Sequence, residues 1–254
     1  MKRLITGILL LAAAVVLFTA CGGRSANQLR MATSADFPPF EFINDAGEID
    51  GFDVHMARAI ADILGYELVI EDMIFDAVIT AVVTGSADIG VAALSITPTR
   101  LETVDFTIPY FETTQVVLVR QDSEITTLND LDGVNIAVQF GTTSATIVDW
   151  IIDGWFLDGV VVDNVNRYPM APETIMSLEQ GHVEAVIIDE AVAALFLADR
   201  PGLRMLDDIL AVEEYAIAVS RDNPELTRRI NDAIQQLKDS GEFQRIYEAW
   251  FGGQ

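Results

Sequence analysis

The stretch ALSITPTRLETVDFTIPYFE, residues 93–112, decides how this chain is interpreted. In it a single arginine, Arg100, follows a Ser-Ile-Thr-Pro-Thr run that is rich in hydroxyl groups. An arginine presents paired N–H donors that match a carboxylate, and hydroxyls can donate to the same group. The chain has 39 acidic and 15 basic residues, so the ordinary alternative is a surface ion pair with Glu102 or Asp105. The local pattern alone favours that ion pair.

The chain begins with MKRLITGILLLAAAVVLFTAC, which has the layout of an export signal. The charged Lys2 and Arg3 precede an apolar run over residues 4–18, and two small residues come before the only cysteine, Cys21. The alternative is a membrane anchor, but the run is shorter than the ~20 residues that a span needs, and no basic flank follows it. We therefore expect residues 1–20 to be a signal peptide and the protein to be exported.

Cys21 follows small residues, as the lipidated cysteine of a lipobox does, although Phe18 stands where such a motif usually has leucine. A single cysteine excludes an internal disulfide. We expect Cys21 to carry a lipid and residues 21–28 to form a tether. The protein would then be a lipoprotein at the outer face of the cytoplasmic membrane, or a protein of the periplasm, and its only membrane contact would be through this lipid.

Removal of the first twenty residues leaves 13 basic and 39 acidic residues, a net charge of −26 on about 230 residues. Such a chain repels nucleic acid and anionic lipid, so nucleic acid is excluded as a partner. Two histidines and one cysteine cannot build a Cys/His metal site, and no Walker A, HExxH or nucleophile-elbow motif is present. We expect no cofactor, no metal and no catalytic residue.

Strand-like and helix-like segments alternate after the tether in two series. The first series has the order βαβαβ, which predicts a parallel sheet covered by helices; its segments are 29–33, 53–64, 66–70, 75–84 and 87–92. The second series contains strands 135–139 and 183–189 and helices 144–152, 173–181 and 190–199. Two extended runs, 114–120 and 214–220, join the series, and two amphipathic helices broken at Ser240–Gly241 end the chain.

This order predicts an α/β protein with two lobes, each a mainly parallel sheet flanked by helices, with two crossing strands as the hinge. Lobe 1 would comprise residues 29–116 and 217–254, and lobe 2 would comprise residues 117–216. The chain length suits one large domain or two of ordinary size.

Six segments, in this order and spacing, resemble the polar amino-acid-binding proteins of ABC importers, the solute-binding protein family 3. They are DFPPFEF (36–42), GEIDGFDVHMARAIADILG (47–65), SITPTRLETVDFTIPYF (95–111), GTTSAT (141–146), VEAVIIDEAVAA (183–194) and GEFQRIYEAWFG (241–252). The resemblance covers nearly the whole chain after the tether. It implies the two-lobed type II periplasmic-binding-protein fold.

The resemblance also implies which residues hold a ligand. Arg100 would bind the α-carboxylate of an amino acid through paired hydrogen bonds, helped by Ser95 and by Thr143 at the start of a helix. Asp189 would bind the ammonium group; the alternative for Asp189 is a helix N-cap, and both uses are compatible.

Phe37 and Phe75 would sandwich the ligand side chain, although an ordinary core role is the default for a phenylalanine such as Phe75. Ala93, Gln139 and Thr142 complete the predicted ligand-binding set. Ala93 stands where many relatives have serine or glycine, so only its backbone could contact a ligand.

Ser34 stands where lysine- and arginine-binding members of the family have an aspartate. This slightly favours a neutral side chain such as that of glutamine over a basic one, unless Asp36 or Gln139 takes the place of the aspartate.

We expect a monomeric, exported receptor that captures a polar L-amino acid by lobe closure and delivers it to the permease subunits of an ABC transporter. One alternative is an enzyme on the same fold, such as a cyclohexadienyl or prephenate-type dehydratase, which would not need an ammonium partner at Asp189. The other is an amino-acid sensor module.

Overall fold

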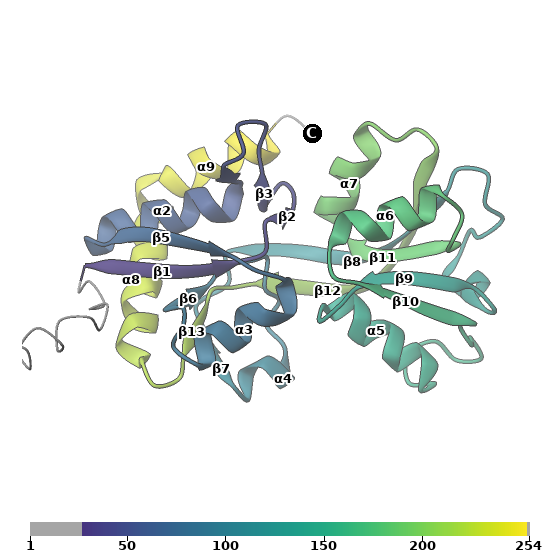
Figure 1. The fold of residues 1–254 in the computed structure, drawn as a ribbon, viewed down its shortest axis with the longest axis horizontal. Coiled ribbons are helices and arrows are strands. Elements are labelled where there is room, and N and C mark those ends of the chain that lie inside the picture. Colours follow the sequence, from purple (N-terminus) through teal and green to yellow (C-terminus); the bar gives the residue numbers. More distant parts are fainter. Residues whose placement is uncertain (1–26, 253–254) are drawn as a thin grey trace, which may run out of the picture.

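The computed structural model describes residues 27–252. The predicted signal peptide, Cys21 and most of the tether lie outside the described residues. Figure 1 shows two α/β lobes side by side, joined by two long strands, β8 (Phe111–Arg120) and β12 (Leu203–Tyr215). The predicted two-lobed α/β fold with two crossing strands is therefore confirmed.

The sheet of lobe 1 has the strand order β5-β1-β6-β13-β7. The parallel strands predicted from the βαβαβ order are β5, β1 and β6, while β13 runs antiparallel to both of its neighbours. The bounds are Gln28–Thr33 for β1, Glu67–Asp72 for β5, Ile89–Gly90 for β6, Val104–Phe106 for β7 and Ala218–Ser220 for β13. The strand expected over 87–92 is thus only two residues long.

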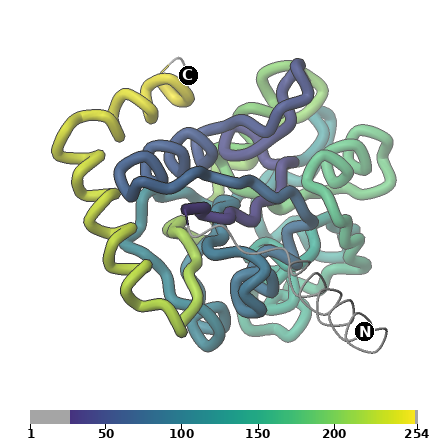
Figure 2. The backbone as a smooth tube through the Cα atoms, turned by 60° about the vertical axis from the view of Figure 1, so that its left-hand side comes forward, coloured from purple at the N-terminus to yellow at the C-terminus, as the bar shows by residue number. Residues whose placement is uncertain are grey.

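Side chains along β1 point alternately to the two faces of the lobe 1 sheet, and both faces are buried. Met31 joins a core formed with α2, α8 and α9, whereas Ala32 joins a second core formed with α3. The helices of this lobe are α2 (Phe52–Leu64), α3 (Phe75–Val83), the single turn α4 (Pro98–Leu101), α8 (Pro224–Ser240) and α9 (Glu242–Phe251). Figure 2 shows α8 and α9 along the outer side of lobe 1, next to α2.

Lobe 2 repeats this plan with the strand order β10-β9-β11-β8-β12. β9 (Asn135–Gln139) is parallel to β10 (Asn164–Tyr168) and β11 (Ala185–Asp189), and β8 runs antiparallel to β11. Ile136 and Val138 face the core that α5 (Thr143–Ile152) covers, and Ala137 faces α6 (Ala171–Glu179) and α7 (Glu190–Ala198). A 3-10 turn, η1 (Leu128–Leu131), precedes β9.

The two crossing strands form a single antiparallel ribbon, paired from Phe111 with Tyr215 to Arg120 with Leu203. The prediction of one crossing run over 214–220 was wrong, because the strand that crosses ends at Tyr215 and residues 218–220 form β13 in lobe 1. Register shifts between Met205 and Ala211 interrupt the side-chain alternation of β12, which explains why its first part carries no strand signal in the sequence.

A small third sheet lies at the inner side of lobe 1 and consists of β2 (Asp36–Phe37), β3 (Glu41–Ile43) and β4 (Ile49–Asp50). Phe40, between β2 and β3, is fully buried and packs its ring against Phe111 at 4.9 Å and Tyr215 at 5.2 Å between centroids. Since Phe111 and Tyr215 are the lobe 1 ends of the crossing strands, the aromatic core anchors the ribbon in this lobe.

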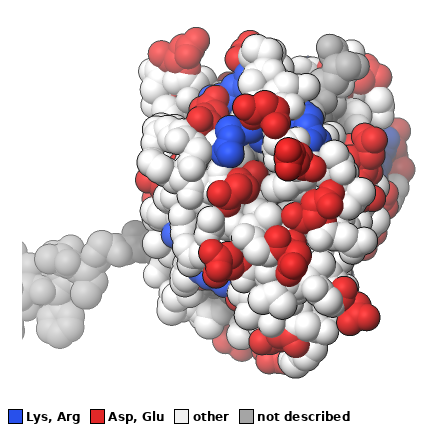
Figure 3. All heavy atoms as spheres, turned by 90° about the vertical axis from the view of Figure 1, so that its right-hand side faces the viewer, with Lys and Arg blue, Asp and Glu red and all other residues white. Residues whose placement is uncertain are grey.

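Acidic side chains are spread over the outer face of lobe 2, with few basic ones among them (Figure 3). Within residues 27–252, no helix combines the length and the apolar character that a membrane crossing requires.

Candidate ligand-binding site

All nine residues of the predicted ligand-binding set line one cavity between the lobes. They are Phe37, Phe75, Ala93, Ser95, Arg100, Gln139, Thr142, Thr143 and Asp189. The cavity measures about 10 Å³, room for about one water molecule. Binding pockets for small molecules have volumes of ~300 Å³ or more, so this conformation is closed and an amino acid can enter only if the lobes separate.

The Arg100 side chain points into this cavity and contacts both lobes. α4 begins at a cap in which Thr97 accepts a hydrogen bond from the Arg100 N–H (3.2 Å). The guanidinium donates from Nη1 to the Ser95 carbonyl (2.8 Å) and from Nη2 to the Gly141 carbonyl in lobe 2 (3.3 Å). It also lies over the Phe75 ring, 5.4 Å from the centroid. The structure does not show the alternative, a surface ion pair of Arg100 with Asp105. Asp105 instead pairs with Arg221, with 3.8 Å between Asp105 Oδ1 and Arg221 Nε.

Asp189 is the buried carboxylate of the cavity. It ends β11 and is 5% exposed, and burial raises its pKa to about 7, with the negative charge of Glu213 adding to the shift. The Tyr215 hydroxyl donates a hydrogen bond to it. Asp189 occupies the N-cap position of α7, but its side chain makes no capping hydrogen bond. The carboxylate is therefore directed to the cavity and not to the helix.

The hydroxyls of Ser95 and Thr143, one from each lobe, both donate to Glu213 Oε2, at 2.5 and 2.8 Å. Gln115 Nε2 donates to the same oxygen (3.4 Å) and to Thr143 Oγ1 (3.3 Å). Glu213 and Gln115 were not among the residues predicted from the sequence. Glu213 lies in the run VEEY, and in so acidic a chain one more carboxylate does not indicate a functional site. Gln115 lies in an extended run and has no feature that distinguishes it from other strand residues.

Ala93 has a left-handed backbone conformation, with φ of 46°, that is unusual for a residue with a side chain. Its N–H donates to Asp53 Oδ2 at 2.8 Å, and the Tyr110 hydroxyl donates to the same oxygen at 2.8 Å. Asp53 thus fixes the backbone of a cavity residue from behind.

A second carboxyl group lies beside Asp53 in the core. Burial raises the pKa of Asp53 to about 6, and burial together with the negative charge of Asp53 raises that of Glu41 well above its ordinary value. Glu41 is fully buried, so its neutral form is favoured.

Gln139 and Asp36 connect the lobes on the other side of the cavity. Gln139 Nε2 donates to Asp36 Oδ2 (3.1 Å), and the N–H of Ala171, the first residue of α6, donates to the same oxygen (3.0 Å). Burial raises the pKa of Asp36 to about 6. Ser34 donates to the other Asp36 oxygen (3.2 Å). Thr142 is the N-cap of α5 and donates to the Gln139 carbonyl (2.8 Å).

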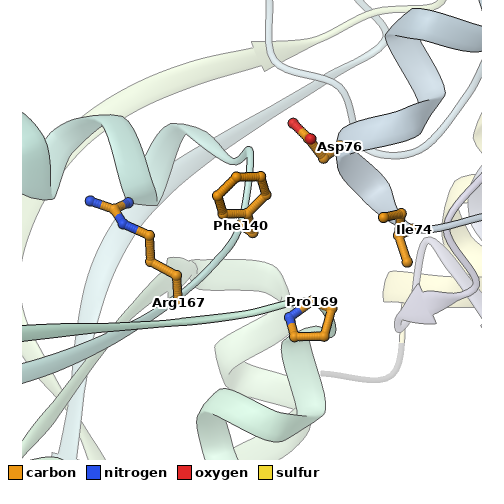
Figure 4. Close-up of a pocket in the computed structure, with 5 residues that line it drawn as sticks. All are labelled: Ile74, Asp76, Phe140, Arg167 and Pro169. Atoms are coloured by element: carbon orange, nitrogen blue, oxygen red, sulfur yellow. The ribbon is translucent and has the colours of Figure 1, made fainter.

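The mouth of the cleft has an exposed apolar side chain on each lobe, with the charged Asp76 and Arg167 beside them. Ile74 and Asp76 at the start of α3 face Phe140 and Pro169 of lobe 2 across a space of about 240 Å³ (Figure 4). Both Ile74 and Phe140 are at least half exposed. Within the described part of the chain, no group of three or more histidine, cysteine or carboxylate side chains is placed to hold a metal ion.

The sequence profile of the bacterial extracellular solute-binding proteins, family 3, matches residues 29–253. A probable histidine-binding protein of Neisseria gonorrhoeae is 31% identical to this chain over 264 residues, covering 96% of this chain and 95% of its own length. The arginine-binding extracellular protein ArtP of Bacillus subtilis is 30% identical and covers 97% of this chain and 98% of its own length.

Solved structures show the same fold. An ancestral arginine-binding protein bound to arginine is 36% identical, with a TM-score of 0.83, and covers 90% of this chain and 100% of its own. The corresponding structure bound to glutamine matches with a TM-score of 0.82. An ancestral amino-acid-binding protein, described as a precursor of cyclohexadienyl dehydratase, is 30% identical with a TM-score of 0.80, and covers 89% of this chain and 96% of its own.

Proposed function

Because this chain belongs to family 3 of the bacterial extracellular solute-binding proteins, we propose that it captures a free polar L-amino acid between its lobes and delivers it to the permease of an ABC importer. The observation that carries the proposal is that one cation and one buried carboxylate, Arg100 from lobe 1 and Asp189 from lobe 2, line the same cavity. A free amino acid has the complementary pair of charges.

Arg100 has five N–H donors and gives two hydrogen bonds to carbonyl oxygens, so donors remain for a ligand carboxylate. Asp189 would meet the ammonium group, which would compensate the burial of its charge. Only a ligand that contacts both lobes stabilises the closed form. Hydrogen bonds to charged groups contribute about 1.5–3 kcal/mol each, enough for a complex of about micromolar affinity.

The relatives named for arginine and histidine make these two amino acids candidates, and the ancestral complexes add glutamine. In this chain Asp36, which accepts a hydrogen bond from Ser34, also accepts hydrogen bonds from Gln139 and the Ala171 N–H. The preference for a neutral side chain over a basic one therefore stays a prediction, and arginine, histidine and glutamine are the ligands to compare.

A thermal-shift screen of the twenty amino acids on the chain from residue 22 onward tests the proposal, because a ligand of the native state raises the melting temperature. Arg100→Ala should abolish every shift that the wild-type protein shows and leave the unliganded fold intact, since a ligand carboxylate would be buried without its partner. Near-normal affinity of this variant in calorimetry would remove Arg100 from its role.

An enzyme is the alternative to compare, because one matching structure is an ancestral amino-acid-binding protein described as a precursor of cyclohexadienyl dehydratase. A dehydratase of this fold would not need Asp189 to bind an ammonium group, whereas an amino-acid receptor would. An α-keto acid, which has no ammonium group, distinguishes the two. Tight binding of the keto acid of the best amino acid would favour the enzyme and count against an ammonium partner at Asp189.

We further propose that the protein acts as a monomer and is anchored through a lipid on Cys21. Cys21→Ser should release it from the membrane fraction and leave its affinity for amino acids unchanged, since serine cannot carry the thioether-linked lipid. A variant that stays with the membrane after fractionation would point to an uncleaved N-terminal anchor instead.

A further inference from the structure

We propose that Glu213 is an internal competitor of the ligand. Its carboxylate, carried by the crossing strand β12, occupies hydroxyl donors that the cleft would otherwise offer to the carboxylate of an amino acid, and it has to leave them before the amino acid is fully bound. This inference rests on the proposed function of the cleft and adds a residue that lowers the affinity of the cleft for amino acids.

The contacts of Glu213 resemble those expected for a bound carboxylate. One oxygen, Oε2, accepts from Ser95 Oγ of lobe 1 at 2.5 Å and from Thr143 Oγ1 of lobe 2 at 2.8 Å. Gln115, on the partner strand of the ribbon, adds a third donor at 3.4 Å. A single carboxylate oxygen therefore joins both lobes through the hydroxyls that flank Arg100.

The charge of Glu213 conflicts with that of an incoming ligand. Burial lowers the pKa of Arg100, and the nearby negative charge of Glu213 opposes this shift. Burial raises the pKa of Asp189, and the charge of Glu213 adds to that shift. A ligand carboxylate placed against Arg100 would come to lie beside this second carboxylate in a largely buried site. Like charges repel strongly where solvent is excluded, so the two carboxylates do not share the donors.

A displaced Glu213 has a place to go. Behind it lies a cavity of about 650 Å³, formed by residues 96–100 of lobe 1, the first turns of α5 in lobe 2, and residues 211–214 of β12. Glu213 is half-buried and lines this larger cavity. The ligand cavity, in contrast, has almost no free space among the nine residues that line it. Rotation of the side chain into the larger cavity would let water solvate the carboxylate.

Glu213 therefore stabilises a closed form that holds no amino acid. The fraction of molecules in this form is not available to bind, and the apparent affinity falls by that fraction. Removal of the carboxylate frees the hydroxyls of Ser95 and Thr143 and removes the repulsion, so both effects act in the same direction.

The test is calorimetry of Glu213→Ala and Glu213→Gln with L-arginine, L-glutamine and L-histidine. Glu214→Ala is the matched control, because Glu214 is the exposed neighbour whose side chain projects from the other face of the strand. We expect Glu213→Ala to bind about tenfold more tightly than wild type, the effect of one charged hydrogen bond, and Glu214→Ala to bind like wild type. Small-angle scattering should also show a larger radius of gyration for ligand-free Glu213→Ala.

The inference would be overturned if Glu213→Ala bound an amino acid as wild type does or more weakly, while the wild-type protein bound normally. Such a result would mean that Glu213 has no effect on binding, or that it stabilises the liganded site. Glu213→Gln keeps the shape of the side chain and decides the question if the alanine variant does not fold. A wild-type protein that binds none of the three amino acids would contradict the proposed function instead.

Discussion

Arg100 and Asp189 respond differently to burial in the same cavity. An arginine keeps its charge in a protein interior, whereas a carboxyl group can take up a proton, and burial raises the pKa of Asp189 to about 7. A ligand ammonium beside Asp189 would stabilise the carboxylate and lower this pKa again. Ligand binding at or below pH 7 is therefore coupled to the release of a proton from Asp189.

This coupling predicts that affinity falls as the pH drops below 7, by up to about tenfold per pH unit, because the proton on Asp189 has to be displaced. Calorimetry between pH 8 and pH 5.5 with an amino acid whose side chain does not titrate measures it. Asp189→Asn should bind weakly at every pH and lose this slope. Wild-type affinity that is constant over the range, with no proton released in buffers of different ionisation enthalpy, would contradict the role of Asp189.

Most of the candidate site could be predicted from the sequence, because its residues lie in motifs that keep their order along the chain. Arg100, Ser95 and Asp189 were placed by resemblance and not by chemistry. Glu213 could not be placed in this way. Its importance comes from the pairing of β8 with β12, which brings it between Ser95 and Thr143, residues far from it in the sequence.

Among the elements, the turn between β9 and α5 controls how closely the lobes approach. Gly141 has φ of 79°, which favours glycine, and its carbonyl accepts from Arg100 of the other lobe. A Cβ atom at this position would lie 2.7 Å from Asp76 Oδ1 on α3. The backbone of lobe 2 therefore approaches lobe 1 so closely here that a side chain fits only if Asp76 moves.

Gly141→Ala should weaken amino-acid binding at least tenfold, because the added methyl group opposes closure. Gly159→Ala is the control: Gly159 has the same φ of 79°, and a Cβ there would meet no atom within 4 Å. Both variants should lose about 1–2 kcal/mol of stability to backbone strain, measured by urea unfolding, and only the first should lose affinity in calorimetry. Equal affinities would show that the lobes do not close this tightly around a ligand.

The ends of helices with clear caps were predicted closely from the sequence, whereas the short strands of the small sheet were not predicted. α2 ends at Gly65 and α8 ends at Gly241, as the sequence indicates, because both glycines have left-handed backbone conformations. The strands of the small sheet, two or three residues long, carry no periodic signal. They depend on the surrounding core, in which Phe40 packs against the crossing strands.

At the scale of the whole molecule, several carboxyl groups are buried in a chain that is already strongly acidic. Burial raises the pKa of Asp36 and Asp53 to about 6, that of Asp189 to about 7, and that of Glu41 well above its ordinary value. In the unfolded chain these groups titrate near pH 4. Between about pH 4 and pH 7 the folded protein therefore binds more protons than the unfolded chain, and its free energy of unfolding falls as the pH rises through this window.

The ligand-free protein should accordingly melt at a higher temperature at pH 5 than at pH 8, by roughly 5–10 °C. Exposed carboxylates whose pKa is lowered, such as Asp130 and Glu225, lose their contribution only at lower pH. Thermal unfolding followed by circular dichroism measures the difference, and 0.5 M salt should leave most of it, since buried groups are poorly screened. A higher melting temperature at pH 8 would show that these four acids are better solvated than the structure indicates.

The pairing of β8 with β12 along their length has one more consequence. Each lobe alone presents only half of a binding site, with Arg100 on one half and Asp189 on the other. The hydrogen-bonded ribbon keeps the second half close to a ligand that has met the first, so the second contact forms within one molecule at a high effective concentration. An amino acid then behaves as a small bivalent ligand, and its avidity depends on the ribbon that joins the two half-sites as much as on the groups that touch it.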